Sequence, residues 1–155
     1  VVIEHLNMTI FIKVGTIMSY DLMVFEKSKA PMFYEDFLNW TSEQTNWNES
    51  RDYNSIDGTS PQLVSWFMEM KETFPPLNGA FSATDEEIDN DSDIERRLTD
   101  YSIGTDIIYA SFGYSADEEA DRLVPIYAKK HHVGLYNPQT CEVYCSGMVY
   151  GNMPT

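Results

Sequence analysis

The sequence predicts an α+β fold, with an antiparallel-dominated sheet and about three helices packed mainly on one face. Segments rich in β-branched and aromatic residues alternate with stretches whose apolar residues recur at helical spacing. These strands and helices are grouped along the chain rather than strictly alternating, which favours α+β over a parallel doubly wound sheet. At 155 residues, the chain fits a single domain, which we expect over residues 18–145.

The first predicted strand and helix lie at the start of this domain. Residues 20–25 are apolar at nearly every position and suit a central, well-buried strand. Pro31 is expected to open the first helix, because a proline at an early helical position loses no hydrogen bond. Phe37 and Trp40 follow at helical spacing, and the helix is expected to end near Thr45.

The second predicted helix has the clearest limits. Ser60 is expected as its N-cap, and Pro61 takes the first helical position. One apolar stripe follows, made of Leu63, Phe67, Met70 and Phe74. Pro75 and Pro76 then end the helix, because a residue before proline is pushed out of the α region.

The last third of the domain contains the remaining strands and the third helix. Residues 100–112 form a strand pair with a turn at 103–106, and Ser115 with Glu118 suggests a capping box for a helix that ends near Lys130. A hairpin is expected over residues 133–145. Residues 146–155 show no periodicity and are expected to form a loose C-terminal tail. Residues 1–17 are expected to be an N-terminal extension before a natural start at Met18.

Two long connections without apolar periodicity separate these elements. Residues 46–59 are polar and turn-rich, with Trp47 and Tyr53 expected to pack the loop against the domain. The second connection, residues 85–95, is expected to be a mobile loop. It holds seven carboxylates in eleven residues: Asp85, Glu86, Glu87, Asp89, Asp91, Asp93 and Glu95. Charges this close repel one another and stay ionised only in water or beside a positive partner.

No metal or cofactor is expected from the sequence. Asp89, Asp91 and Asp93 have the spacing of calcium-loop positions, but Ile94 stands where the loop needs glycine. Cys141 and Cys145 lack histidines at a zinc spacing, and no glycine-rich phosphate loop is present. The two cysteines are expected to be reduced, which favours a cytoplasmic location.

The excess of acidic residues favours some classes of binding partner and disfavours others. Lys and Arg number 10 against 25 Asp and Glu, which gives a net charge of −15 and a pI near 4.3. Such a surface repels nucleic acid and anionic membranes and favours a basic protein, although the charge also suits solubility alone. Because recognition residues concentrate in loops, the predicted partner-binding residues are Trp47, Asp52 and Tyr53 together with the seven carboxylates of residues 85–95.

The chain from Met18 to about Cys145 resembles a group of small acidic bacterial proteins of unknown function. The resemblance rests on residues 18–25, 59–70 and 74–79, and is extended by residues 100–104, 107–109 and 115–120. It implies that residues 1–17 lie outside the shared domain. It supplies no activity.

The predicted function is a non-catalytic acidic protein-binding module, with an immunity-type antitoxin that masks a basic partner as its concrete version. No catalytic residue is expected, because the sequence has no nucleophile motif and coincidental carboxylate pairs abound in so acidic a chain. Two alternatives stay open. One is a small hydrolase-like enzyme that uses rim carboxylates, with Asp100 or Glu69 as the base, and the other is a nucleic-acid mimic.

Overall fold

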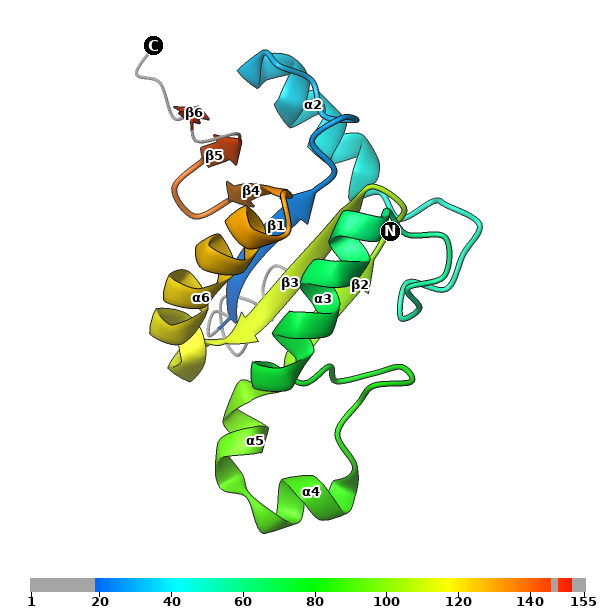
Figure 1. Cartoon of the computed structure of the whole chain (residues 1–155), viewed down its shortest axis with the longest axis vertical. Helices are drawn as coiled ribbons and strands as arrows, with labels where there is room; N and C mark the ends of the chain where they lie inside the picture. Colours follow the sequence, from blue (N-terminus) through cyan, green and yellow to red (C-terminus); the bar gives the residue numbers. More distant parts are fainter. Residues whose placement is uncertain (1–18, 146–147, 152–155) are drawn as a thin grey trace, which may run out of the picture.

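A six-stranded sheet with the strand order β2-β3-β1-β4-β5-β6 forms the centre of the protein (Figure 1). The computed structural model describes residues 19–145 and 148–151. The strands are β1 (Ser19–Phe25), β2 (Thr99–Ile103), β3 (Ile107–Gly113), β4 (Gly134–Asn137), β5 (Glu142–Cys145) and β6 (Met148–Gly151). Each neighbouring pair is antiparallel. The predicted α+β class with an antiparallel-dominated sheet is therefore confirmed.

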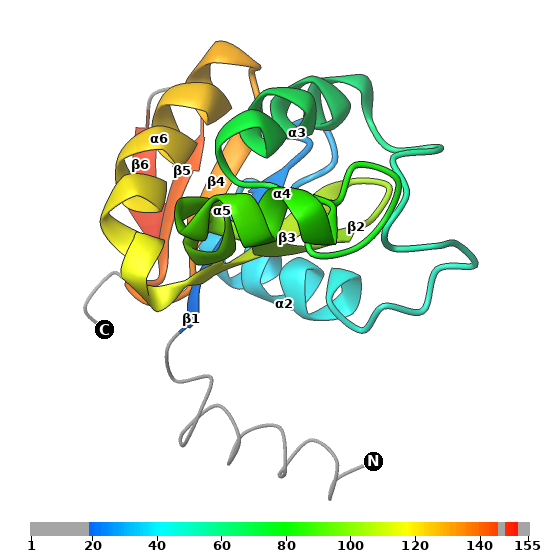
Figure 2. The ribbon, with the colours of Figure 1, turned by 90° about the horizontal axis from the view of Figure 1, so that it is seen from below.

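Helices cover both faces of this sheet. The longer ones are α2 (Tyr34–Gln44), α3 (Pro61–Thr73) and α6 (Asp117–Lys130), the last preceded by the 3-10 turn η2 (Tyr114–Ala116). In Figure 2, α3 and α6 lie on one side of the sheet and α2 on the other. Two short helices, α4 (Asp85–Asn90) and α5 (Ser92–Arg97), extend from one end of the domain (Figure 1).

The alternation of β1 explains why both faces need a cover. Leu22 and Val24 belong to the larger core cluster, with residues of α3 and α6, whereas Met23 and Phe25 belong to a second cluster with Phe37 of α2. Successive side chains of a strand point to opposite faces, so a central strand buried on both sides needs an unbroken apolar run.

Two predicted helix starts differ from the structure, whereas the start of the second helix at Pro61 is confirmed, without the expected side-chain cap. The first helix begins at Tyr34 rather than at Pro31, and Phe33 is its N-cap. Ser60 precedes α3 as expected, but its hydroxyl donates a hydrogen bond to Glu26 Oε1 instead of capping the helix. The capping box expected at Ser115 is also wrong, because that residue lies in η2 and α6 begins after Ala116 without a side-chain cap.

The expectation for the C-terminal tail needs a correction. Residues 148–151 form β6, which pairs with β5 in a regular register from Cys145 opposite Met148 to Glu142 opposite Gly151. The backbone pairing makes this segment the last strand of the sheet rather than a loose end. The expected N-terminal extension, residues 1–17, lies outside the described residues.

The two long connections are tied by backbone hydrogen bonds to the outer edge of β2. The amide of Ile103 donates to the carbonyl oxygen of Tyr53 at 2.8 Å. At the other end of the strand, the Thr99 amide donates to Pro75 and the Leu77 amide donates to Thr99, both at 2.9 Å. Loop 46–59 and the segment after α3 are thus placed side by side along one edge of the sheet.

Candidate functional site

Loop 46–59 is fastened to the domain by its own polar side chains. The Arg51 guanidinium donates through Nη2 to the Ser55 carbonyl oxygen at 2.7 Å and to Thr59 Oγ1 at 2.9 Å. The Thr59 hydroxyl in turn donates to the Gly104 carbonyl oxygen at 3.0 Å. These bonds hold the loop in one conformation, which agrees with the expectation that it packs against the domain.

Trp47 and Tyr53 hold this loop to the sheet. The Trp47 ring lies edge-on to the Tyr53 ring at 5.2 Å and to the Tyr109 ring at 6.4 Å, measured between centroids. The Tyr53 hydroxyl accepts a hydrogen bond from the Glu49 amide at 2.6 Å. Both predicted partner anchors are therefore half-buried inside the protein. Their contact with a partner stays a prediction.

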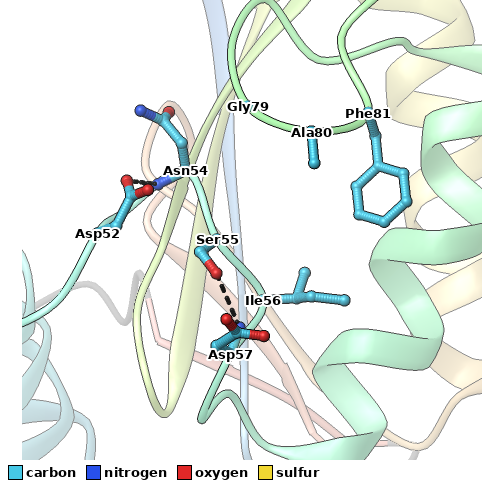
Figure 3. Close-up of a pocket in the computed structure, with 8 residues that line it drawn as sticks. All are labelled: Asp52, Asn54, Ser55, Ile56, Asp57, Gly79, Ala80 and Phe81. Atoms are coloured by element: carbon cyan, nitrogen blue, oxygen red, sulfur yellow. Dashed lines mark hydrogen bonds between the residues drawn. The ribbon is translucent and has the colours of Figure 1, made fainter.

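A pocket of about 350 Å³ lies between loop 46–59 and the segment that follows α3 (Figure 3). In Figure 3, the side chains of Ile56 and Ala80 extend into the space between the two segments, and the Phe81 ring closes one side. Eight residues line the pocket: Asp52, Asn54, Ser55, Ile56, Asp57, Gly79, Ala80 and Phe81. Asp52 is the one of the ten predicted site residues that lines it.

Close contacts between the two segments fix the shape of this pocket. Gly79 has a φ of +94°, and a Cβ atom there would stand 2.7 Å from the Asn54 carbonyl oxygen, so a side chain would clash with the opposite wall. The Phe81 ring packs edge-on against Phe67 at 6.0 Å, and Lys71 Nζ lies 5.2 Å from its centroid. One wall is therefore anchored to α3 and its core.

The pocket combines an apolar interior with an acidic rim. Phe81 is 39% exposed and the nearby Leu77 48% exposed, which is high for large apolar side chains. Asp52 and Asp57 are exposed on the side of loop 46–59. Asp52 Oδ1 accepts a hydrogen bond from the Asn54 amide at 2.9 Å, which orients the carboxylate without neutralising it.

The acidic segment forms two short helices, so the prediction of a loop is wrong. A capping box starts α4: the Glu87 amide donates to Thr84 Oγ1 at 3.1 Å, and the Thr84 amide donates to Glu87 Oε1 at 3.2 Å. Asp91 caps α5 by accepting a hydrogen bond from the Asp93 amide at 2.9 Å. Acidic side chains in the first turn of α4 also complement the positive end of the helix dipole.

Asp93 differs from the other six acids of this segment because two arginines neutralise it. Arg97 Nε lies 2.7 Å from Asp93 Oδ2, and Arg96 Nη2 lies 2.8 Å from Asp93 Oδ1. Hydrogen bonds from Arg97 and Arg96 lower the pKa of the Asp93 carboxyl below its ordinary value. Both arginines also pair with Glu119 of α6, at 2.7 and 2.6 Å. The side chains of Asp85, Glu86, Glu87, Asp89, Asp91 and Glu95 are exposed.

The structure separates the residues that resembled a calcium loop. Asp89 lies in α4, Asp91 between the two helices and Asp93 in α5, where it is engaged by arginines. Within residues 19–145 and 148–151, no group of three or more histidine, cysteine or acidic residues is arranged to hold a metal ion. In the same part of the chain, no helix is long and apolar enough to cross a membrane.

The two carboxylates considered as catalytic bases lie apart and in unlike surroundings. Glu69 of α3 lies 2.6 Å from His131 Nε2 and 2.9 Å from Lys130 Nζ, and hydrogen bonds from His131 and Lys130 lower its pKa. A lowered pKa makes a carboxylate a weaker base. Asp100 precedes Tyr101, which is buried in the core cluster that includes residues of α3, so Asp100 faces the opposite side of the sheet. They do not form a pair.

A polar cluster that the sequence reasoning missed surrounds the turn between β2 and β3. Ser60 donates to Glu26 Oε1 at 2.5 Å, and this bond lowers the pKa of the Glu26 carboxyl. The Thr105 amide and hydroxyl donate to Glu49. Burial raises the pKa of Asp106, with Glu49 and Glu26 adding to the effect and Lys29 opposing it. The bonded groups of this cluster join β1, the start of α3 and loop 46–59 to the turn.

Among the residues that the structure describes, Asp85, Glu86 and Asp89 of α4 and Asp52 and Asp57 of the pocket are exposed and form no ion pair. Glu69, Glu26 and Asp93 are each engaged by cationic or hydroxyl groups. Comparison with models of protein families, with curated proteins and with solved structures found no match.

Proposed function

We propose that the protein is a non-catalytic acidic module that binds a basic protein partner. The binding surface, called here the α4 surface, consists of the pocket with its rim and the exposed acids of the following helix: Asp52, Ile56, Asp57, Ala80, Phe81, Asp85, Glu86 and Asp89. The observation that carries the proposal is the adjacency of an exposed apolar pocket and carboxylates without a cationic neighbour. Such surfaces combine an anchor site with a charge that steers a partner.

Chain connectivity keeps the pocket and the start of α4 close together. Phe81 closes the pocket and Asp85 begins α4 four residues later. A span of four residues places their Cα atoms at most about 14 Å apart. Asp52 and Asp57 lie on the wall that loop 46–59 forms.

The concrete version of this proposal is an immunity-type antitoxin that masks the basic surface of a toxin or nuclease in the bacterial cytoplasm. Tight masking benefits from a preformed surface, because ordering loops on binding reduces affinity. The hydrogen bonds of Arg51 and the close approach of Gly79 to Asn54 supply such order before any partner arrives.

The test compares two variants of equal net charge. The triple variant Asp85→Asn, Glu86→Gln, Asp89→Asn removes three charges from the α4 surface. The control Glu35→Gln, Asp36→Asn, Glu43→Gln removes three exposed charges from α2, on the other face of the sheet. A basic protein captured from extracts of the source organism is purified, and its complex with each variant is measured by calorimetry.

The wild type is expected to form a one-to-one complex that weakens steeply as NaCl rises from about 50 mM to about 200 mM. The α4 variant should bind about tenfold more weakly, whereas the α2 control should stay within about twofold of the wild type. If no basic protein forms a stoichiometric complex, or if both variants lose affinity equally, the proposed function is wrong.

A further inference from the structure

We infer that the pocket receives one apolar side chain of the partner, carried by an extended segment with lysine or arginine on both sides of that residue. The inference rests on the proposed function and names the chemistry that its pocket recognises. It is built from three features of the α4 surface: the size and lining of the pocket, the position of its charges, and its rigidity.

The size and lining of the pocket suit a single apolar side chain. Its volume of about 350 Å³ lies at the small end of the range for ligand sites, roughly 300–1,000 Å³. Ile56, Ala80 and Phe81 supply its apolar surface, and Phe81 is 39% exposed. The entry of an aliphatic or aromatic side chain would remove this surface from water.

The charges around the pocket suit basic residues next to that side chain. Asp52 and Asp57 stand on one wall, and Asp85 and Glu86 follow the other wall at the start of α4. An extended segment advances about 3.3 Å per residue. Basic side chains one or two positions from the anchor would therefore come within reach of Asp52 and Asp57, and the acids of α4 add negative charge beyond the other wall. An acidic or neutral segment would lack this complementarity.

The rigidity of the walls favours a defined anchor over loose adhesion. Gly79 approaches the Asn54 carbonyl oxygen so closely that a Cβ atom would stand 2.7 Å from it. Arg51 fastens the Ser55 backbone at 2.7 Å. Phe81 is held against Phe67. A pocket that needs no ordering on binding retains more of the free energy of burying the anchor.

The experiment uses two basic peptides of identical charge with the full-length protein. One has the sequence Lys-Arg-Lys-Leu-Lys-Arg-Lys, and the other has serine in place of leucine. Each peptide carries a fluorophore at its N-terminus, and binding is followed by anisotropy. We expect the leucine peptide to bind about tenfold more tightly than the serine peptide, because one aliphatic side chain is buried.

Three variants assign that preference to the pocket. Ala80→Gln places a larger polar side chain in the pocket and should abolish the preference for leucine. Asn78→Gln changes an exposed residue of the same segment that does not line the pocket, and should retain the preference. The double variant Asp52→Asn, Asp57→Asn should weaken the binding of both peptides in equal proportion, since it removes charge from the rim and leaves the apolar interior unchanged. Circular dichroism confirms that each variant is folded.

The outcomes separate this inference from the proposed function. Equal binding of the two peptides to the wild type, or a leucine preference that survives Ala80→Gln, would overturn the pocket assignment. If the triple variant Asp85→Asn, Glu86→Gln, Asp89→Asn still lowers the affinity for the purified partner in that case, the binding function stands without the anchor. If the leucine preference depends on Ala80 but no basic protein partner exists, the inferred peptide chemistry holds and the proposed function fails.

Discussion

At the scale of single residues, two glycines show how differently the loops constrain the backbone. Gly58 and Gly79 both adopt positive φ angles, +78° and +94°, which L side chains rarely adopt. Nothing lies within 4 Å of a Cβ atom built on Gly58, whereas at Gly79 such an atom would stand 2.7 Å from the Asn54 carbonyl oxygen. The first position therefore requires glycine for conformation alone. The second requires it for conformation and for space.

Alanine substitution should distinguish these two requirements. Gly58→Ala is expected to lower the free energy of unfolding by about 1 kcal/mol, from backbone strain alone. Gly79→Ala should lower it by about 3 kcal/mol, because the loop must also move away from Asn54. Urea denaturation of both variants measures the two values. Equal losses would show that the close contact between the pocket walls is absent in solution.

At the scale of elements, the sequence determined those whose signals are local. The limits of α3 were predicted almost to the residue, from Pro61 at its start, its apolar stripe and the two prolines that follow it. The unbroken apolar run of β1 also indicated correctly that both of its faces are buried. The prediction of a loop at the acidic segment is wrong because charge repulsion there is outweighed by local helix signals, among them the capping box of Thr84 with Glu87.

The candidate site was less accessible from sequence, since its parts meet only in three dimensions. Whether Trp47 faces a partner or the domain depends on Tyr109, which belongs to a strand far along the chain. The pocket depends on Asn54 and Gly79 meeting across two connections. The pairing of Asp93 with Arg96 and Arg97 had a local signal, the helical spacing of three and four residues. Its extension to Glu119 had none.

The contact between α5 and α6 provides a prediction at this scale. Glu119→Gln removes the negative charge that pairs with both arginines, at 2.7 and 2.6 Å, and replaces one of the two acceptor oxygens with a donor, so it should loosen the attachment of α5 to α6. Amides of α4 and α5 should then exchange with solvent about two- to fivefold faster. Hydrogen exchange followed by mass spectrometry measures this rate.

The neighbouring substitution Glu118→Gln is the matched control. Glu118 is exposed, and its substitution removes one negative charge from the same turn of α6 as Glu119→Gln does. Its exchange rates in α4 and α5 should match those of the wild type. Acceleration by both variants would indicate that net charge, rather than the ion pairs of Glu119 with Arg96 and Arg97, governs the attachment.

At the scale of the whole molecule, acidic residues outnumber basic ones by 25 to 10. Of the basic residues, Arg96, Arg97, Lys71 and Lys130 are engaged in ion pairs within the described part of the chain. Most carboxylates are therefore balanced only by solvent ions. A net charge this far from zero favours solubility and destabilises the compact state through self-repulsion.

Salt should consequently stabilise the protein. Raising NaCl from about 20 mM to about 300 mM is expected to raise the Tm by several degrees, because screening weakens the repulsion between carboxylates. The α2 variant Glu35→Gln, Asp36→Asn, Glu43→Gln should show a smaller rise, since part of the repulsion is already removed. Differential scanning calorimetry gives both values, and a Tm that falls with added NaCl would contradict this account.

The backbone bonds along the outer edge of β2 have a consequence for self-association. Strands at the edge of a sheet present free amides and carbonyls that can recruit another chain and start aggregation. In this protein Tyr53 occupies one end of that edge, and Pro75 and Leu77 occupy the other. The segments that form the pocket therefore also shield the edge from strand addition. Cleavage within either segment would expose a template for fibril growth, so an intact pocket and resistance to aggregation depend on the same stretches of chain.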